Sequence, residues 1–208
     1  MARERESRAP QVSPARVVPL FPLAEVWLFP SVVLPLHVFE PRYRQMIEDS
    51  LDGPGRLVLG TIQAEHEHES AGNPPIYPIA GLGEIGRHEH LEDGRFNILL
   101  VGLQRVFVQE APSDRLYRKV EIHPAAEIAV PVAREPALRQ ELIEALKART
   151  ENLPPIPKEL STSHLTDMLC LRMPLPHDVL SQLYCELDVE RRARAALEQH
   201  GLRPKLGE

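Results

Sequence analysis

Prolines interrupt a long apolar run near the start of the chain. Residues 17–47 read VVPLFPLAEVWLFPSVVLPLHVFEPRYRQMI, and the part from Val17 to Phe39 carries one formal charge, Glu25. That length and apolarity would fit a membrane-spanning helix, which needs about 20 apolar residues. Each proline inside a helix costs about 3 kcal/mol, however, and four prolines lie within this part. The run is therefore not one continuous helix.

Short strands suit the pieces between the prolines. Residues that precede a proline favour extended geometry. The pieces EVWLF (residues 25–29) and SVVLPL (residues 31–36) are rich in Val, Leu, Phe and Trp, which favour buried strands. We expect both pieces to be strands of a small sheet or barrel, and we expect Trp27 to be a core residue rather than a platform for a ligand.

One helix and further strands are expected between residues 39 and 124. In FEPRYRQMIEDSLDGPG (residues 39–55), Pro41 suits a first helical turn, and apolar residues follow at helical spacing. Strands are predicted for RLVLGTIQ (residues 56–63) and RLYRKVEIHP (residues 115–124), with a polar loop at residues 64–75.

A β-hairpin is the clearest local prediction. In residues 83–110 two strand-like runs flank Asp93-Gly94, a dipeptide that favours a two-residue turn because both positions tolerate a positive φ. Gly102, in the second run, is expected at a bulge or bend.

The hydrophobic period changes to that of helices after about residue 130. Helices are predicted for residues 135–152, 164–173, 177–186 and 188–200, with Ser163 and Asp188 as possible N-caps and Gly201 just past the last helix. We expect Arg191, Arg192 and Arg194 to form an exposed face of the last helix, paired with Glu190 and Glu198.

This order of elements predicts an α+β protein with the strands first and a small helical bundle second. We expect a disordered tail at residues 1–15, a β subdomain at 16–130, a helical bundle at 131–202 and a flexible tail at 203–208.

Composition and charge favour an ordinary globular protein with a net charge of -6. A negative net charge disfavours nucleic acid as a partner. The first 16 residues lack the apolar core of a signal peptide, so we expect a cytoplasmic protein that does not associate with membranes. Cys170 and Cys185 are expected to be buried free thiols.

Three long segments together resemble the N-terminal domain of Lon proteases, most closely the stand-alone Lon-domain proteins. They are PLFPLAEVWLFPSVVLPLHVFEPRYRQMIEDSL (19–51), GLGEIGRHEHLEDGRFNILLVGLQRVFV (81–108) and HLTDMLCLRMPLPHDVLSQLYCELDVERRARAALE (164–198). The resemblance implies a bent, PUA-like β-barrel module with an early inserted helix, followed by the bundle. The family often has glycine where this chain has Ser31, and we therefore expect no positive φ there.

Motifs of catalysis are missing from these 208 residues. They contain no G-x-x-x-x-G-K-[ST] phosphate loop, no stretch that resembles the serine-lysine site of Lon proteases, and no nucleophile elbow or Rossmann fingerprint. We therefore expect neither enzymatic activity nor a cofactor.

Two pairs of histidines are weak candidates for metal binding. His66 and His68 alternate with glutamates in a predicted loop, and His88 and His90 do so in the hairpin. On a strand this spacing places both rings on one face, which is one way to build a zinc site. Exposed His and Glu are common without a metal, so we favour solvated side chains.

The resemblance implies a non-catalytic module that binds unfolded or extended polypeptide, or a partner protein, with a role in protein quality control. The sequence indicates neither the binding surface nor the oligomeric state. RNA binding is an alternative, because PUA-like folds include RNA binders, but its support is one short basic cluster, Arg115, Arg118 and Lys119. A small metalloprotein that uses the histidine pairs is the third hypothesis.

Overall fold

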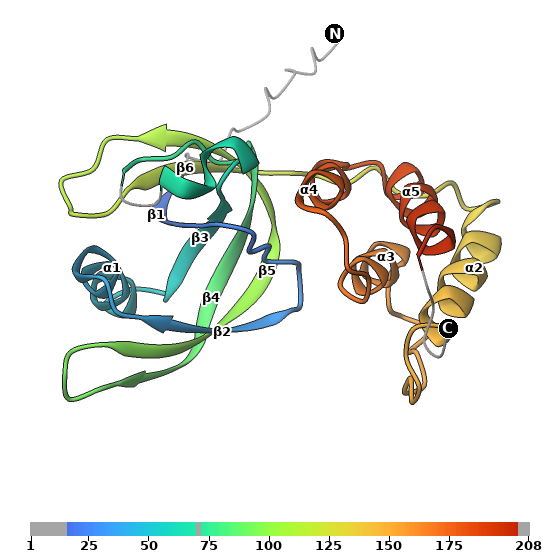
Figure 1. Cartoon of the computed structure of the whole chain (residues 1–208), viewed down its shortest axis with the longest axis horizontal. Helices are drawn as coiled ribbons and strands as arrows, with labels where there is room; N and C mark the ends of the chain where they lie inside the picture. The colour runs from blue at the N-terminus through green and yellow to red at the C-terminus, as the bar shows by residue number, and fades with distance from the viewer. Residues whose placement is uncertain (1–15, 70–71, 204–208) are drawn as a thin grey trace, which may run out of the picture.

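A β-barrel and a helical bundle lie side by side in the computed structural model, which describes residues 16–69 and 72–203 (Figure 1). The expected tails at 1–15 and 203–208 lie outside the described residues, apart from Arg203. The six strands of the described part are β1 Arg16–Leu23, β2 Val33–Val38, β3 Arg56–Thr61, β4 Ile79–His90, β5 Phe96–Ala111 and β6 Lys119–Pro124.

The sheet closes on itself through the long strand β5. The strand order is β2-β5-β4-β3-β1-β6, and β5 also pairs with β6. One half of β5 (residues 96–101) pairs with β2 and the other half (residues 106–111) pairs with β6, while β1 and β3 form the single parallel pair among the described strands. The expected α+β fold with a bent barrel is confirmed.

Helix α1 (Pro41–Leu51) is inserted between β2 and β3, as predicted, with Pro41 in its first turn. Its buried residues Tyr43, Met46 and Ile47 pack against the barrel strands, including Phe96 and Ile98 of β5. A short 3-10 helix, η1 (Ala64–Glu69), lies where we expected only a polar loop.

The four bundle helices of the described chain are α2 Glu135–Lys147, α3 Thr162–Cys170, α4 His177–Cys185 and α5 Val189–Gly201. Their core is continuous with the side of the barrel, because Trp27, Phe29 and Ile79 belong to the same cluster as Leu138 and Leu165. Trp27 is 7% exposed, which confirms the expectation of a core residue.

The piece EVWLF is not a strand. Residues 24–32 run between β1 and β2 without regular strand pairing, and their side chains alternate between two cores. Trp27 and Phe29 pack toward the bundle, while Leu28 packs inside the barrel. The alternating pattern therefore indicates an extended chain that lies between two apolar layers. In sequence, such a segment has the same pattern as a strand.

Glycines of β4 and β5 allow this segment to approach closely. A Cβ on Gly81 would lie 2.5 Å from the Leu28 carbonyl oxygen, and one on Gly102 would lie 2.1 Å from the Phe29 oxygen. The backbone of Gly102 accepts a hydrogen bond from the Ser31 N–H (2.8 Å) and donates one to the Val32 oxygen (2.8 Å). The expected irregularity at Gly102 is confirmed, because the β4–β5 register shifts there and leaves Leu103 as an extra residue.

Ser31 has a φ of 65°, so our expectation of a negative φ is wrong. The close contact with Gly102 fixes the turn from β1 into β2, and the turn needs the left-handed conformation whichever residue stands there. The Ser31 hydroxyl also lies 3.1 Å from Nε2 of His164 on α3.

The β4–β5 hairpin is confirmed, but its two-residue turn is not. Leu91 and Arg95 close the hairpin through the Leu91 N–H and the Arg95 oxygen (2.8 Å), which leaves a three-residue loop. Gly94 alone of the loop residues has a positive φ, +80°. The Asp93 carboxylate instead accepts hydrogen bonds from Arg95, so the loop is a turn followed by a left-handed glycine.

Two helix ends differ from the sequence-based expectation. Ser161 rather than Ser163 caps α3 and accepts the N–H of His164. Gly201 is the last residue of α5 rather than the residue beyond it, while Asp188 caps the other end of that helix as expected.

A buried arginine of β5 joins the barrel to the bundle. Arg105 donates two hydrogen bonds to the Asp167 carboxylate of α3 (2.8 and 3.0 Å) and one to the Tyr184 carbonyl of α4 (3.0 Å). Its side chain is 2% exposed and that of Asp167 is 4% exposed. Tyr184 in turn donates its hydroxyl to the Leu28 oxygen (2.8 Å), which secures the segment between β1 and β2.

Arg192 belongs to the same buried network, so the exposed face that we expected around it is wrong. Its side chain is completely buried and donates to Glu127, to Ser163 and to the Glu186 carbonyl. Arg191 and Arg194 are exposed, as expected. Their partners differ from those expected: Arg191 pairs with Glu186 and Asp188, and Arg194 pairs with Glu141. Helical periodicity places Arg192 on the inner face with Val189 and Ala196, and its buried carboxylate partners come from other elements.

Substitutions of Ser31 should show that its positive φ costs free energy of folding. Alanine and glycine both lack the hydroxyl, but only glycine adopts a positive φ without strain. We expect Ser31→Gly to be more stable than Ser31→Ala by about 1 kcal/mol in urea unfolding. Equal stability of the two variants would contradict the positive φ.

Glu127 should make stability depend on pH. Burial raises the pKa of this carboxyl, but attraction to Arg192 and hydrogen bonds from Arg192 and Ser163 outweigh that effect and hold the pKa below its usual value. A group whose pKa is lowered by folding stabilises the protein above its unfolded pKa, about 4.3, and loses this effect as the pH falls through the folded pKa.

We therefore expect Glu127→Gln to cost about 1–2 kcal/mol at pH 7. The difference from the wild type should shrink as the pH is lowered from 5 to 3, as measured by urea unfolding at each pH. A difference that stays constant over this range would contradict the assigned role.

Candidate functional site

A shallow groove of about 650 Å³ lies on the outer face of the barrel. Strands β2, β4 and β5 form its floor. Its lining residues are Pro35, Leu36, His37, Arg87, His88, Glu89, Asn97, Ile98 and Leu99.

Strand alternation explains which side chains face the groove. In β2 and in residues 96–101 of β5 the residues with even numbers, such as Leu36 and Ile98, turn toward the barrel core, and their neighbours turn outward. Pro35 pairs with Leu99 in the register of the two strands, and Val33 pairs with Val101. Leu99 is 37% exposed and lies beside Pro35 in the groove, which therefore has an apolar strip along one end.

A row of polar side chains crosses the other end of the groove. Nδ1 of His37 donates to the Asn97 side-chain oxygen (2.8 Å), and the Asn97 amide donates to Glu89 (3.0 Å). Arg95 lies 3.2 Å from the other ring nitrogen of His37 and donates to it, which fixes the tautomer. These hydrogen bonds hold His37, Asn97 and Glu89 in place beside the apolar strip.

The free edge of β2 is a poorer candidate for binding than the groove. Among the described strands, β2 pairs with β5 alone. Gly102 donates a hydrogen bond to the Val32 oxygen, and hydrogen-bonded pairs alternate along an antiparallel ladder. The main-chain N–H and C=O groups of Val33, Pro35 and His37 therefore point away from β5. Because Pro35 has no N–H, a strand added at this edge would lack a donor in the middle.

The four histidines predicted as weak metal candidates lie at the surface in two places. His66 and His68 belong to η1 rather than to a strand, and His88 and His90 lie near the end of β4. His88 lines the groove, and the ring of His90 stacks on Phe96 at 4.4 Å between centroids.

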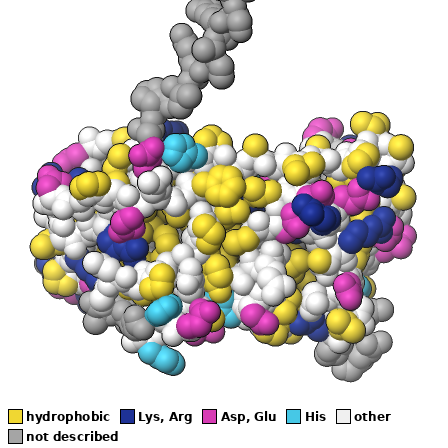
Figure 2. Space-filling model, turned by 90° about the horizontal axis from the view of Figure 1, so that it is seen from above, with side chains coloured by type: hydrophobic (Ala, Val, Ile, Leu, Met, Phe, Trp, Pro, Cys, Tyr) yellow, Lys and Arg dark blue, Asp and Glu magenta, His cyan; other side chains and the backbone are white. Residues whose placement is uncertain are grey.

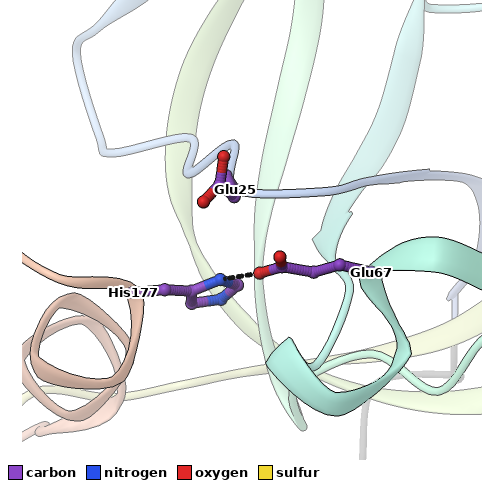
Figure 3. A group of neighbouring side chains, drawn as sticks. All are labelled: Glu25, Glu67 and His177. Carbon is purple, nitrogen blue, oxygen red and sulfur yellow. Dashed lines mark hydrogen bonds and ion pairs between the residues drawn. The ribbon is translucent and has the colours of Figure 1, made fainter.

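A different group of possible metal ligands lies between the barrel and the bundle. It consists of Glu25, Glu67 and His177, and it is the only such group of three among the described residues (Figure 3). Glu67 stands between His66 and His68 in the sequence, but nothing in the sequence connects it to Glu25 or to His177, which is 110 residues further along the chain. Sequence reasoning therefore missed this group.

The basic cluster that supported RNA binding is neutralised by acidic neighbours. Each of its members lies beside a carboxylate: Arg115 beside Asp49 (3.3 Å), Arg118 beside Glu110 (2.8 Å) and Lys119 beside Asp114 (2.7 Å). Cations that are already paired offer little attraction for phosphates.

The two thiols are poor nucleophiles. Burial raises the pKa of Cys170 to about 12 and that of Cys185 to about 11, so that both are protonated at neutral pH. Both are free cysteines, as expected; Cys170 is buried and Cys185 is partly buried.

A second apolar area lies between the barrel and the bundle. Figure 2 shows hydrophobic side chains gathered over the middle of this face, with charged side chains toward both ends. The segment that joins β6 to α2 exposes Ile128 (58%) and Val132 (86%). The groove is the stronger candidate, because it combines an apolar strip with polar side chains of fixed orientation.

None of the helices in residues 16–69 and 72–203 has both the length and the apolar character required to cross a membrane.

Known proteins with similar sequences include Lon proteases. The chain is 26% identical over 157 residues to Lon protease of Dictyoglomus thermophilum, and 29% identical over 154 residues to Lon protease 2 of Sorangium cellulosum. These matches cover 76% and 74% of the chain but 19% of each relative, so the chain spans about a fifth of the length of these proteases.

Solved structures with the same fold are Lon N-terminal domains. The N-terminal domain of Mycobacterium avium complex Lon protease superposes with a TM-score of 0.68 at 16% identity, and covers 89% of this chain and 98% of its own. The Lon N-terminal domain protein from Xanthomonas campestris superposes with a TM-score of 0.63 at 21% identity, and covers 88% and 98%. Residues 17–199 match the profile of the ATP-dependent protease La (LON) substrate-binding domain, and the chain belongs to this family.

Proposed function

We propose that this protein is a non-catalytic module that binds extended or unfolded segments of polypeptide. The observation that carries the proposal is the match of residues 17–199 to a family described as a substrate-binding domain of a protease. The matched part of this chain covers only 19% of each of these two relatives, and their proteolytic activity is not part of the proposal.

The groove on β2, β4 and β5 is the proposed binding surface. Its apolar strip suits the hydrophobic side chains that an unfolded polypeptide exposes, and the His37–Asn97–Glu89 row offers hydrogen-bonding groups for the peptide main chain. The main chain of β2 lacks a donor at Pro35, so the peptide is expected to lie across the outer face of the sheet rather than to extend its edge.

We also propose that the two subdomains have different roles. The barrel, with the boundaries 16–130, carries the groove, and the bundle, with the boundaries 131–202, packs against another side of the barrel through Arg105 and Asp167. Free cysteines fit a reducing compartment, so we place the protein in the cytoplasm. The family match is the basis on which we propose a role in protein quality control.

Binding to a permanently unfolded protein tests the proposal. A reduced, carboxymethylated protein labelled with fluorescein serves as the probe, and fluorescence anisotropy measures its Kd. We expect Leu99→Ser to raise the Kd about 5- to 10-fold, since loss of one central apolar contact typically costs about 1–1.5 kcal/mol.

Leu116→Ser is the matched control, because Leu116 is 67% exposed and lies outside the groove. Its Kd should equal that of the wild type. Equal weakening by the two substitutions would contradict the groove as the binding surface, and failure of the wild type to bind the probe would contradict the proposed function.

A further inference from the structure

Three side chains from separate elements meet at the junction of the barrel and the bundle. Glu25 follows β1, Glu67 lies in η1 and His177 is the first residue of α4. One ligand atom from each lies within 4.8 Å of the others, and Figure 3 shows both carboxylates beside the imidazole ring. Nδ1 of His177 is in direct contact with a carboxylate oxygen of Glu67.

The surroundings of His177 determine which ring nitrogen is available as a ligand. Nε2 is buried and has no hydrogen-bond partner among the described residues. The rings of Trp27 and Tyr77 each lie 5.7 Å from the imidazole, and an aromatic face accepts an N–H weakly but offers nothing to a lone pair. The Glu67 carboxylate only accepts hydrogen bonds, so Nδ1 carries the hydrogen in this contact. A metal ion on Nδ1 would select the tautomer with hydrogen on Nε2, where the aromatic neighbours accept it weakly.

Two carboxylates beside Nδ1 of His177 favour a positive charge between them. The N–H of Nδ1 supplies a partial positive charge, whereas a divalent cation would supply more and would use all three groups. Glu25 also has a φ of 54°, a conformation that costs a residue other than glycine free energy and that is common at functional sites.

We propose that Glu25, Glu67 and His177 form a zinc site. One imidazole nitrogen and two carboxylates are typical zinc ligands, whereas magnesium and calcium prefer oxygen alone. Tetrahedral bonds of 2.0–2.2 Å separate neighbouring ligand atoms by about 3.3 Å, so the Glu67 carboxylate needs only a small shift from its hydrogen-bonded position. Three protein ligands leave a fourth position for water, on the side where Glu25 is exposed.

Such an ion would connect two loops of the barrel directly to α4. It would therefore stabilise the junction that Arg105 and Asp167 hold further inside. The site is separate from the groove on β2, β4 and β5 and does not depend on the proposed polypeptide binding.

Trp27 provides a direct signal for metal binding, because it is the only tryptophan of the chain and lies beside His177. We expect one equivalent of Zn²⁺ by isothermal titration of the metal-free protein, and a saturable change in Trp27 fluorescence, with quenching when paramagnetic Co²⁺ replaces zinc. At 100 times the Kd, Zn²⁺ should raise the Tm by about 5–10 °C.

The variants Glu25→Gln and Glu67→Gln should each weaken Zn²⁺ binding at least tenfold and reduce the rise in Tm. Glu25 is exposed, so its variant is expected to fold even if a substitution at the more buried His177 does not. The double variant His88→Ala/His90→Ala is the control and should bind as the wild type does.

Two results would overturn the proposal. One is the absence of any saturable Trp27 or calorimetric response to Zn²⁺ in the wild type, which would leave His177 simply hydrogen-bonded to Glu67. The other is binding that survives both glutamine substitutions but disappears in the His88→Ala/His90→Ala control.

Discussion

The buried pair between Arg105 and Asp167 determines how the two halves of the molecule meet. Arginine is charged at any pH a protein encounters, and a buried guanidinium without a carboxylate is strongly destabilising. The forked pair therefore holds α3 against β5 in one orientation. The same guanidinium donates a hydrogen bond to the Tyr184 carbonyl, and the Tyr184 hydroxyl donates one to the Leu28 oxygen. The positions of α4 and of the segment after β1 are therefore linked to the Arg105–Asp167 pair.

The two candidate surfaces depend on that contact to different degrees. The groove is built within the sheet, and its shape follows from strand alternation and from the register of β2 with β5. The group of Glu25, Glu67 and His177 exists only because α4 is placed beside the loops of the barrel. A rearrangement of the junction would thus separate Glu25, Glu67 and His177 from one another and leave the groove intact.

Local rules succeeded where the cause of structure lies within a few residues. Helical spacing identified α1 and α2, Asp188 was identified as a cap, and the proline-rich run was recognised as extended chain. The same rules failed where a distant contact decides the outcome. Residues 25–29 have the alternation of a strand but lie between two cores, and Ser31 adopts a positive φ because Gly102 binds the chain there. The hairpin was found, but the Asp93 carboxylate and Arg95 selected a longer loop than the dipeptide suggested.

The α+β class, the order of the elements and the resemblance to Lon N-terminal domains could be predicted without the structure. They depend on hydrophobic periodicity, on the positions of prolines and on long characteristic segments, which are all properties of consecutive residues. The sequence did not determine which charged residues are buried or which side chains converge. Arg192 looks like its exposed neighbours until the carboxylates of Glu127 and Asp167 are placed around it. Glu25, Glu67 and His177 have no spacing in common. Only tertiary structure brings such residues together, since burial and electrostatic pairing depend on distance in space and not on separation along the chain.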